Sequence, residues 1–189
     1  MKTLLITALL LAAGNTFAAS CPAPHTLSIH GIHLGATFAD IQQILPDVKR
    51  TDTASGGDII IPANVDISAV MPELLSITYI ALNAADQVES FGVLFSWGEG
   101  EMIGEDTPVE EVTARVAEKY GLPATGWQKE ALMPEGERKA LGYDDRAAQM
   151  VLHCSDYRII IAQDFAVGRQ SLGPRMLVMA ADSAAAKAE

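Results

Sequence analysis

The sequence predicts an α+β protein made of two tandem units, each a helix followed by an antiparallel meander, packed as one compact body. Two observations carry this prediction. The same helix-start signal occurs at Thr37 and at Thr107, and each signal is followed by short apolar runs separated by turn residues. The repetition of this order suggests a duplicated unit. The first unit is expected over residues 19–96 and the second over residues 107–180.

Residues 27–46 open the first unit with a short strand, a turn at Gly35 and a helix. Thr37 is the expected N-cap of this helix, and Asp40 is placed to complete a capping box. Pro46 ends the helix, because a proline ring does not fit a helix interior. The apolar face of the helix is expected to contain Phe38, Ile41, Ile44 and Leu45.

Strand signals follow this helix. The segment DIIIP is a short apolar run, and the segments SITYIAL and VESFGVLF flank the turn-forming residues NAADQ. Two apolar runs around a short polar turn predict a β-hairpin. The first unit is therefore expected to be one helix followed by a meander.

The second unit begins with the segment DTPVEEVTARVAEKYGLP. Thr107 is the expected N-cap, Pro108 the first helical residue, and Glu110 the residue that closes a capping box. Gly121 and Pro123 mark the end of the helix. The buried face of the helix is expected to contain Val109, Val112, Val116 and Tyr120.

On the exposed side of the same helix, Glu111 and Arg115 are one turn apart and can form an ion pair. Strand signals then recur near Trp127 and in the segments AAQMVLHC, YRIIIAQ and RMLVMA. Residues 181–189 are rich in alanine and charged side chains, so a flexible tail is expected there.

Residues 1–18 have the pattern of a secretory signal peptide. Lys2 supplies a positive charge, residues 4–13 form an apolar run, and Thr16 and Ala18 flank a small-residue cleavage site. This apolar run is too short for a membrane span, which needs about twenty residues. The mature chain is therefore expected to be exported to the periplasm and to have no membrane span.

The chain has only two cysteines, Cys21 and Cys154. An even number of cysteines in an exported chain favours a disulfide, which would close a long loop and stabilise the fold. The alternative is a lipid anchor on Cys21, as in bacterial lipoproteins. The residues before Cys21 are small, as that signal requires, but Ala18 stands where a large apolar residue is expected. The sequence therefore favours the disulfide.

The chain is strongly acidic, with 24 Asp and Glu residues, 13 Lys and Arg residues and a net charge of −11. Removal of residues 1–18 takes this charge to −12, because Lys2 is the only charged residue among them. Such a surface repels nucleic acid and anionic lipid and attracts cationic groups. A protein with a cationic surface is therefore the expected partner. A plainer interpretation is that the charge keeps an exported protein soluble.

The sequence contains no pattern typical of an enzyme active site. A Gly-x-Ser-x-Gly turn, a His-Glu-x-x-His helix, a phosphate-binding glycine loop and a Cys-x-x-Cys pair are all absent from it. His153, Ser155 and Asp156 are close in sequence, but residues of one strand end do not converge as a catalytic triad does. We therefore expect a protein that is not an enzyme and that uses no cofactor.

His30 and His33 are the candidates for binding a transition metal, with His25 as a third ligand. Residues three positions apart in an extended chain point to opposite faces, which opposes a shared metal. Ordinary surface and turn histidines are therefore expected, and no metal site is predicted.

The segment SWGEGEMIGED joins the two expected units, with an acidic, glycine-rich connection over residues 97–106. Aromatic and Met residues surrounded by charge are typical of a protein-binding patch. The candidate partner contacts are Trp97, Glu99, Glu101, Met102, Glu105 and Asp106. The alternative is a flexible linker in which Trp97 fills part of the core.

The segment GIHLGATFADIQQILP resembles the opening of the small outer-membrane lipoproteins of the SmpA/OmlA family. The shared positions are Gly31, Gly35, Thr37 and Pro46, and Ala36 stands where that family favours Met. Two helix-plus-meander units tied by a cysteine pair are also similar in architecture to the beta-lactamase inhibitory protein. This second resemblance implies a scaffold whose relatives bind other proteins.

Two functions therefore remain open. The leading hypothesis is a periplasmic, non-enzymatic protein-binding module that uses an acidic concave sheet or the segment 96–106, for example to inhibit a basic envelope or cell-wall hydrolase. The alternative is an envelope assembly or maintenance factor that is lipidated at Cys21 and resides at the outer membrane.

Overall fold

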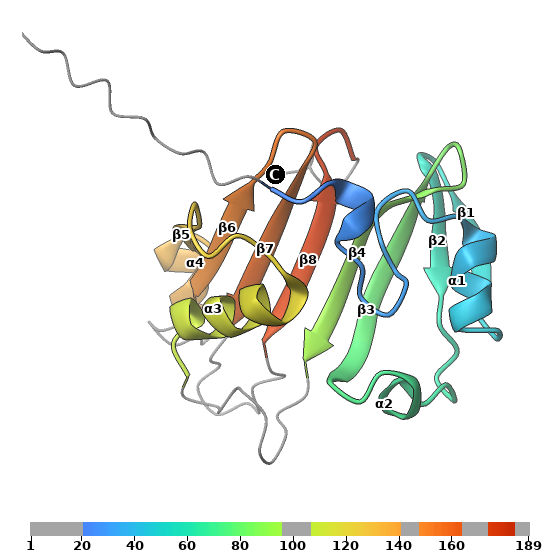
Figure 1. Ribbon diagram of the computed structural model, residues 1–189, viewed down its shortest axis with the longest axis horizontal. Helices are drawn as coiled ribbons and strands as arrows, with labels where there is room; N and C mark the ends of the chain where they lie inside the picture. Colours follow the sequence, from blue (N-terminus) through green and yellow to red (C-terminus); the bar gives the residue numbers. More distant parts are fainter. Residues whose placement is uncertain (1–20, 96–106, 141–147, 164–173, 184–189) are drawn as a thin grey trace, which may run out of the picture.

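The computed structural model describes residues 21–95, 107–140, 148–163 and 174–183 (Figure 1). Within these residues, eight strands form one antiparallel sheet, accompanied by four α-helices and one short 3₁₀ helix. The α+β class predicted from the sequence is confirmed, although the sheet dominates the structure. The predicted signal peptide, the predicted connection 97–106 and residues 184–189 lie outside the described residues.

The helices are η1 (Pro24–Thr26), α1 (Phe38–Ile44), α2 (Ile67–Val70), α3 (Val109–Tyr120) and α4 (Glu135–Ala140). The strands are β1 (Lys49–Thr53), β2 (Gly56–Ile60), β3 (Leu74–Asn83), β4 (Val88–Phe95), β5 (Gln128–Ala131), β6 (Ala148–His153), β7 (Tyr157–Gln163) and β8 (Arg175–Ala180). Among the described helices, none has both the length and the hydropathy of a membrane span.

The strand order in the sheet is β1-β2-β3-β4-β8-β7-β6-β5. Neighbouring strands within β1–β4 and within β5–β8 are consecutive in the chain, and β4 pairs with β8 at the centre of the sheet. The central register places Phe91 opposite Val178 and Val93 opposite Met176. The last strands of the two halves of the chain therefore lie side by side.

One face of the sheet carries the main hydrophobic core. Figure 1 shows α1, α3 and the segment around η1 in front of this face, and α3 contacts β6 and β7. Alternate residues of the central strands enter this core, because successive side chains of a strand point to opposite faces. The fully buried core residues of those strands are Phe91, Val93, Ile159, Ile161, Met176 and Val178.

The start of α1 has the predicted capping box. The Thr37 hydroxyl accepts a hydrogen bond from the backbone N–H of Asp40, and the Asp40 carboxylate accepts one from the backbone N–H of Thr37 at 2.8 Å. The bond from the Thr37 N–H, followed by the bond from its hydroxyl, lowers the pKa of Asp40. Ile41 and Leu45 are buried and the other two residues of the expected apolar face are half-buried, which confirms that face.

The start of α3 differs from the prediction. The N-cap is Pro108 rather than Thr107, and the helix begins at Val109. Pro108 itself makes no side-chain capping hydrogen bond. The Glu110 carboxylate does not close a capping box but accepts a hydrogen bond from Lys129 of β5 at 2.6 Å. The Glu110 carboxylate, which the local pattern assigned to the helix cap, therefore forms an ion pair between α3 and β5 instead.

The remainder of α3 follows the prediction. Gly121 is the C-cap in the left-handed conformation, with φ of 65°, which glycine adopts without strain. Val112 and Val116 are buried, and Glu111 pairs with Arg115 on the exposed side. The helix phase inferred from the apolar spacing is therefore correct.

The expected strands are present, with two differences. Ile29 and Ile32 form only an isolated bridge, where the sequence predicts a short strand. Strand β1 is polar and exposed along its whole length, so it has no apolar pattern that would predict it. It pairs with β2 at the sheet edge, where its charged side chains discourage pairing with another chain.

The residues after β8 continue to contact the sheet. The backbone N–H of Ala181 donates to the carbonyl of Asp156 at 2.8 Å, and Ser183 is fully buried. The described start of the expected tail is therefore held against the β6–β7 turn.

Candidate functional site

The six predicted partner contacts, Trp97, Glu99, Glu101, Met102, Glu105 and Asp106, all lie outside the described residues. The structure therefore does not test this predicted site. Within the described residues, three features combine polar or reactive groups: the disulfide, a cluster around Glu73, and a pocket beside α3.

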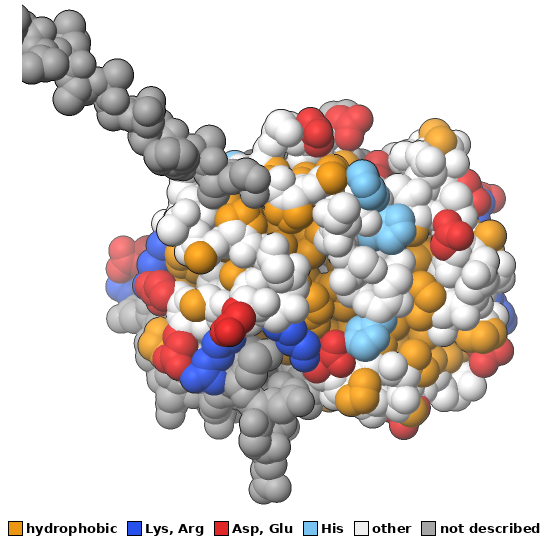
Figure 2. All heavy atoms as spheres, in the orientation of Figure 1, with side chains coloured by type: hydrophobic (Ala, Val, Ile, Leu, Met, Phe, Trp, Pro, Cys, Tyr) orange, Lys and Arg blue, Asp and Glu red, His pale blue; other side chains and the backbone are white. Residues whose placement is uncertain are grey.

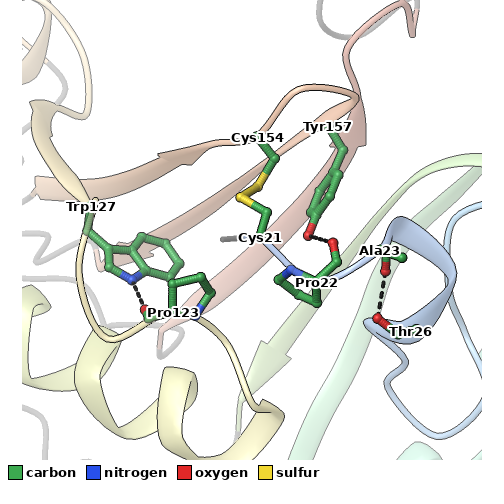
Figure 3. The surroundings of a disulfide bond; sticks show 8 residues. All are labelled: Cys21, Pro22, Ala23, Thr26, Pro123, Trp127, Cys154 and Tyr157. Atoms are coloured by element: carbon green, nitrogen blue, oxygen red, sulfur yellow. Dashed lines mark hydrogen bonds between the residues drawn. A yellow bond between two sulfur atoms is a disulfide. The ribbon is translucent and has the colours of Figure 1, made fainter. Parts of the chain in front are cut away.

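The disulfide between Cys21 and Cys154 is present, as predicted (Figure 3). It joins the segment before η1 to the turn between β6 and β7. Beside it, the hydroxyl of Tyr157 donates a hydrogen bond to the carbonyl of Pro22 at 2.7 Å. Burial raises the pKa of Tyr157 and the neighbouring Asp156 raises it further, so the hydroxyl keeps its proton and remains a donor.

These contacts bear on the chemistry of Cys21. A sulfur bonded to Cys154 has no valence left for a thioether to a lipid, and no thiol for nucleophilic attack. In this structure both cysteines therefore have a structural role, which is to hold the N-terminal segment against the second half of the chain.

Two of the candidate metal-binding histidines contact other groups of the chain. His30 contacts Glu73, and the Nδ1 atom of His33 lies 2.9 Å from the carbonyl oxygen of Leu34. Among the residues that the structure describes, no group of three or more His, Cys, Asp and Glu side chains could hold a metal ion.

His153, Ser155 and Asp156 remain at the end of β6 and in the turn that follows it. His153 faces Glu130 of the neighbouring edge strand β5, with 3.6 Å between Nε2 and Oε1. This is an exposed polar contact between two strands at the sheet edge, with 53% and 43% of the two side chains accessible.

Glu73 is the centre of a polar cluster that sequence patterns did not reveal. Its Oε1 atom lies 2.5 Å from Nε2 of His30, 3.3 Å from the Tyr120 hydroxyl and 3.9 Å from the Lys119 ammonium. Figure 2 shows histidine, acidic and basic side chains adjacent to one another between α3 and α2. The cluster therefore joins the N-terminal segment, the α2–β3 connection and the end of α3.

The electrostatics of this cluster stabilise the charged carboxylate. Burial alone raises the pKa of Glu73, since only 14% of its side chain is exposed. A backbone N–H bond, the hydrogen bond with His30 and the charge of Lys119 outweigh burial, and the net effect is a lowered pKa. Glu73 is therefore ionised at neutral pH.

A histidine held by a carboxylate also occurs in catalytic triads, where the nucleophile forms a hydrogen bond with the other ring nitrogen of the imidazole. Here the hydroxyl of Tyr120 bonds to the same Glu73 oxygen that contacts His30. Both groups thus share one acceptor, and no proton path runs from the hydroxyl through the imidazole. The arrangement is suited to fastening three segments together.

A pocket of about 220 Å³ lies between α3, the α3–β5 connection and β6. Its walls are Glu110, Thr113, Ala114, Ala117, Ala124, Thr125, Gly126, Trp127 and Met150. Alanines 114 and 117 are one turn apart on α3, so their short side chains leave space in front of β6. Trp127 forms part of the opposite wall.

The main polar groups of this pocket are already engaged. The indole N–H of Trp127 donates to the carbonyl of Pro123 at 2.8 Å (Figure 3), and the hydroxyl of Thr113 donates to the carbonyl of Val109 at 2.7 Å. Glu110 is paired with Lys129, a bond that lowers the pKa of Glu110. The surface that remains for a ligand is therefore mainly apolar.

In comparisons of the chain with protein-family models, with curated proteins and with solved structures, nothing matched.

Sequence reasoning missed the Glu73 cluster and the pocket for different reasons. Glu73 and His30 are 43 positions apart, and no local pattern connects them. The pocket had a partial signal, because Ala114 and Ala117 interrupt an otherwise valine-lined helix close to Trp127.

Proposed function

We propose that the mature chain is a periplasmic, non-enzymatic binding protein for a partner with a cationic surface, such as a basic envelope or cell-wall hydrolase that it inhibits. The observation that carries this proposal is the distribution of charge over the described residues. The full sequence, residues 1–18 included, has a net charge of −11, so acidic side chains are in excess.

Most described basic side chains are already paired with acids. The paired residues are Arg50, Arg115, Lys119, Lys129 and Lys139. Several exposed carboxylates have no ion pair with any described basic side chain: Asp47, Asp58, Glu118 and Glu137. The acidic excess is thus presented to solvent rather than neutralised locally, and it attracts a cationic surface over a distance of about one Debye length, roughly 10 Å.

The face of the sheet opposite the helices gives less support as the docking surface. Ser90, Ile160, Ala162 and Met179 occupy its centre, and all four are buried. The acidic residues of this face, such as Asp58 and Glu130, lie near the sheet edges. An acidic concave sheet is therefore not the basis of the proposal.

The two-unit arrangement is part of the proposal. Each half of the chain contributes a helix followed by four strands that neighbour one another in the sheet. From each edge of the sheet to its centre, the four strands of one half follow one another in chain order, and the last strand of each half, β4 or β8, lies at the centre. This symmetry is what a duplicated unit with paired final strands would give.

The disulfide argues for export and against lipidation. A bond between cysteines is stable in an oxidising compartment, as the periplasm is. The same bond occupies the sulfur that a lipoprotein would use, so no observation favours the alternative of a lipidated assembly factor. The intact mass of the exported protein checks this point, because a diacylglyceryl adduct on Cys21 would contradict it.

The proposal is tested by binding kinetics. The mature chain is immobilised and used to capture proteins from an envelope extract, and the captured protein is then purified. Its association rate should fall steeply between about 0.02 M and 0.15 M salt, because long-range attraction is screened over that range. A variant with Asp47→Asn, Asp58→Asn, Glu118→Gln and Glu137→Gln should associate more slowly. An association rate that depends on neither salt nor these four charges would contradict cationic recognition.

A further inference from the structure

We propose that the pocket between α3, the α3–β5 connection and β6 receives one aromatic side chain of the cationic partner. This inference rests on the proposed function and adds to it the residue type that anchors the partner. It is carried by the volume of the pocket, the state of its polar groups and the charge around it.

The volume is suited to a single ring. A cavity of about 150 Å³ lined by apolar side chains is known to hold benzene. The pocket has about 220 Å³ and is open on one side, so it accommodates a ring together with the carbon that links the ring to its backbone. It is too small for most free ligands, whose sites span about 300–1,000 Å³.

The side chains that line the pocket favour the binding of an apolar group. The Trp127 indole N–H, the Thr113 hydroxyl and the Glu110 carboxylate all have partners within the chain. Neither the indole N–H nor the Thr113 hydroxyl proton is left to donate to a polar ligand, so these groups favour an apolar ring. Trp127 offers its ring, and aromatic pairs gain about 0.5–1.5 kcal/mol beyond the area that they bury.

The acidic residues near the pocket indicate which kind of partner would present this ring. The exposed Glu118 lies on α3 one residue after the wall residue Ala117, and it has no ion pair with a described basic side chain. Glu110, one of the wall residues, is already paired with Lys129. An aromatic residue flanked by lysines would therefore place its ring in the pocket and its charges near the Glu118 carboxylate. Aromatic residues are also the side chains most often found as energetic anchors of interfaces.

The test uses two peptides of defined sequence, acetyl-Lys-Lys-Phe-Lys-Lys-amide and the same peptide with Ala in place of Phe. Binding to the mature chain is followed by two-dimensional ¹H–¹⁵N NMR, with the amide of Gly126 and the indole N–H of Trp127 as reporters. The Phe peptide should shift both signals and bind about tenfold more tightly than the Ala peptide, the size of effect expected for one anchor residue.

Two matched variants locate the effect. Ala114→Leu fills the pocket from α3, and Ala39→Leu makes the same change at an exposed position of α1. Both substitutions introduce a good helix former on a helix, so neither should unfold the protein. The preference for the Phe peptide should disappear in Ala114→Leu and remain in Ala39→Leu.

The outcomes separate the inference from the proposed function. Equal binding of both peptides, with salt dependence, would overturn the aromatic pocket and leave cationic recognition intact. Tight binding of acetyl-tyrosine-amide, equal to that of the Phe peptide, would overturn a protein partner as the occupant and indicate a small-molecule site. Unchanged Gly126 and Trp127 signals at saturating Phe peptide would overturn the pocket itself, whatever the capture experiment shows.

Discussion

Each half of the chain has a longer helix ahead of four strands, but the halves differ in where their short helix lies and in how they cover the sheet. Helix α2 follows the second strand of the first half, whereas α4 follows the first strand of the second half. In the first half the helix α1 has 7 residues, and an irregular segment adds Leu27, Ile29, Ile32 and Leu34 to the core. Hydrogen bonds tie the end of this segment to the start of β4, where the Gly35 N–H donates to the Val88 carbonyl at 2.8 Å. In the second half the helix α3 has 12 residues, and this helix alone covers most of the core face of the sheet in that half.

A matching order of strands in the sheet therefore does not give matching surfaces. The irregular segment of the first half fills the space beside α1 with large apolar side chains. The second half has alanines at the corresponding boundary of α3, and a pocket remains there. Two features contain residues from both halves and join them: the disulfide and the Glu73 cluster.

The largest expected effect comes from placing a charge in each core. Ile41 and Val112 both have 0% exposure, so Ile41→Asp and Val112→Asp each bury an unpaired carboxylate. Each variant should lose about 4 kcal/mol or more of unfolding free energy, measured by urea titration. If the halves form one cooperative body, each variant unfolds in a single transition, and two transitions would show that the halves unfold separately.

Glu111→Ala is the control for these two variants. Half of the Glu111 side chain is exposed, with 51% accessible, and its partner is Arg115 on the same helix. Such a surface pair contributes about 0–1 kcal/mol. A loss for Glu111→Ala equal to that for Val112→Asp would mean that the phase of α3 is wrong.

Removing the disulfide should have the next largest effect. The double variant Cys21→Ala and Cys154→Ala should lose about 2–5 kcal/mol of unfolding free energy, because the bond closes a loop with a sequence separation of 133. Hydrogen exchange should increase most in residues 21–34, which the bond holds against the second half. Exchange that increased equally in β4 and β8 would contradict a local role for the bond.

The cap of α1 should contribute less. Thr37→Ala removes the hydroxyl that accepts from the Asp40 N–H, so about 1 kcal/mol of unfolding free energy should be lost. Thr37→Ser keeps a hydroxyl at the same place and should retain most of the stability. Equal thermal midpoints for the alanine and serine variants would show that the cap contributes nothing.

The smallest expected effect is a change in pH dependence at Glu73. The pKa of Glu73 is lower in the folded protein than its usual value of 4.5, so its contribution is present above that value and is lost as the pH falls through the folded pKa. Glu73→Gln should therefore make the loss of stability between about pH 5 and pH 3 shallower than in the wild type. Parallel curves of unfolding free energy against pH for the two proteins would contradict this assignment.

Many local features were predictable from the sequence. The capping box at Thr37, the phase of α3 and the β3–β4 hairpin each depend on residues that are close in the chain. The pairing of Cys21 with Cys154 is a long-range contact, but it was predictable because the chain offers no other cysteine. Thr107 shows the limit of local patterns, because the expected capping partner Glu110 bonds to Lys129 of β5 instead.

Local patterns and the cysteine count were enough to predict the α+β class, the positions of the two main helices, most of the strands and the disulfide. The pairing of β4 with β8 and the polar edge strand β1 became visible in the folded chain alone. The same holds for the contacts of Glu73 with His30 and Tyr120 and for the pocket beside α3. The physical reason is the range of the interactions. Apolar periodicity and capping involve residues within one or two helical turns of each other. Glu73 instead contacts residues 43 and 47 positions away in the sequence, and such contacts depend on how the whole sheet is assembled.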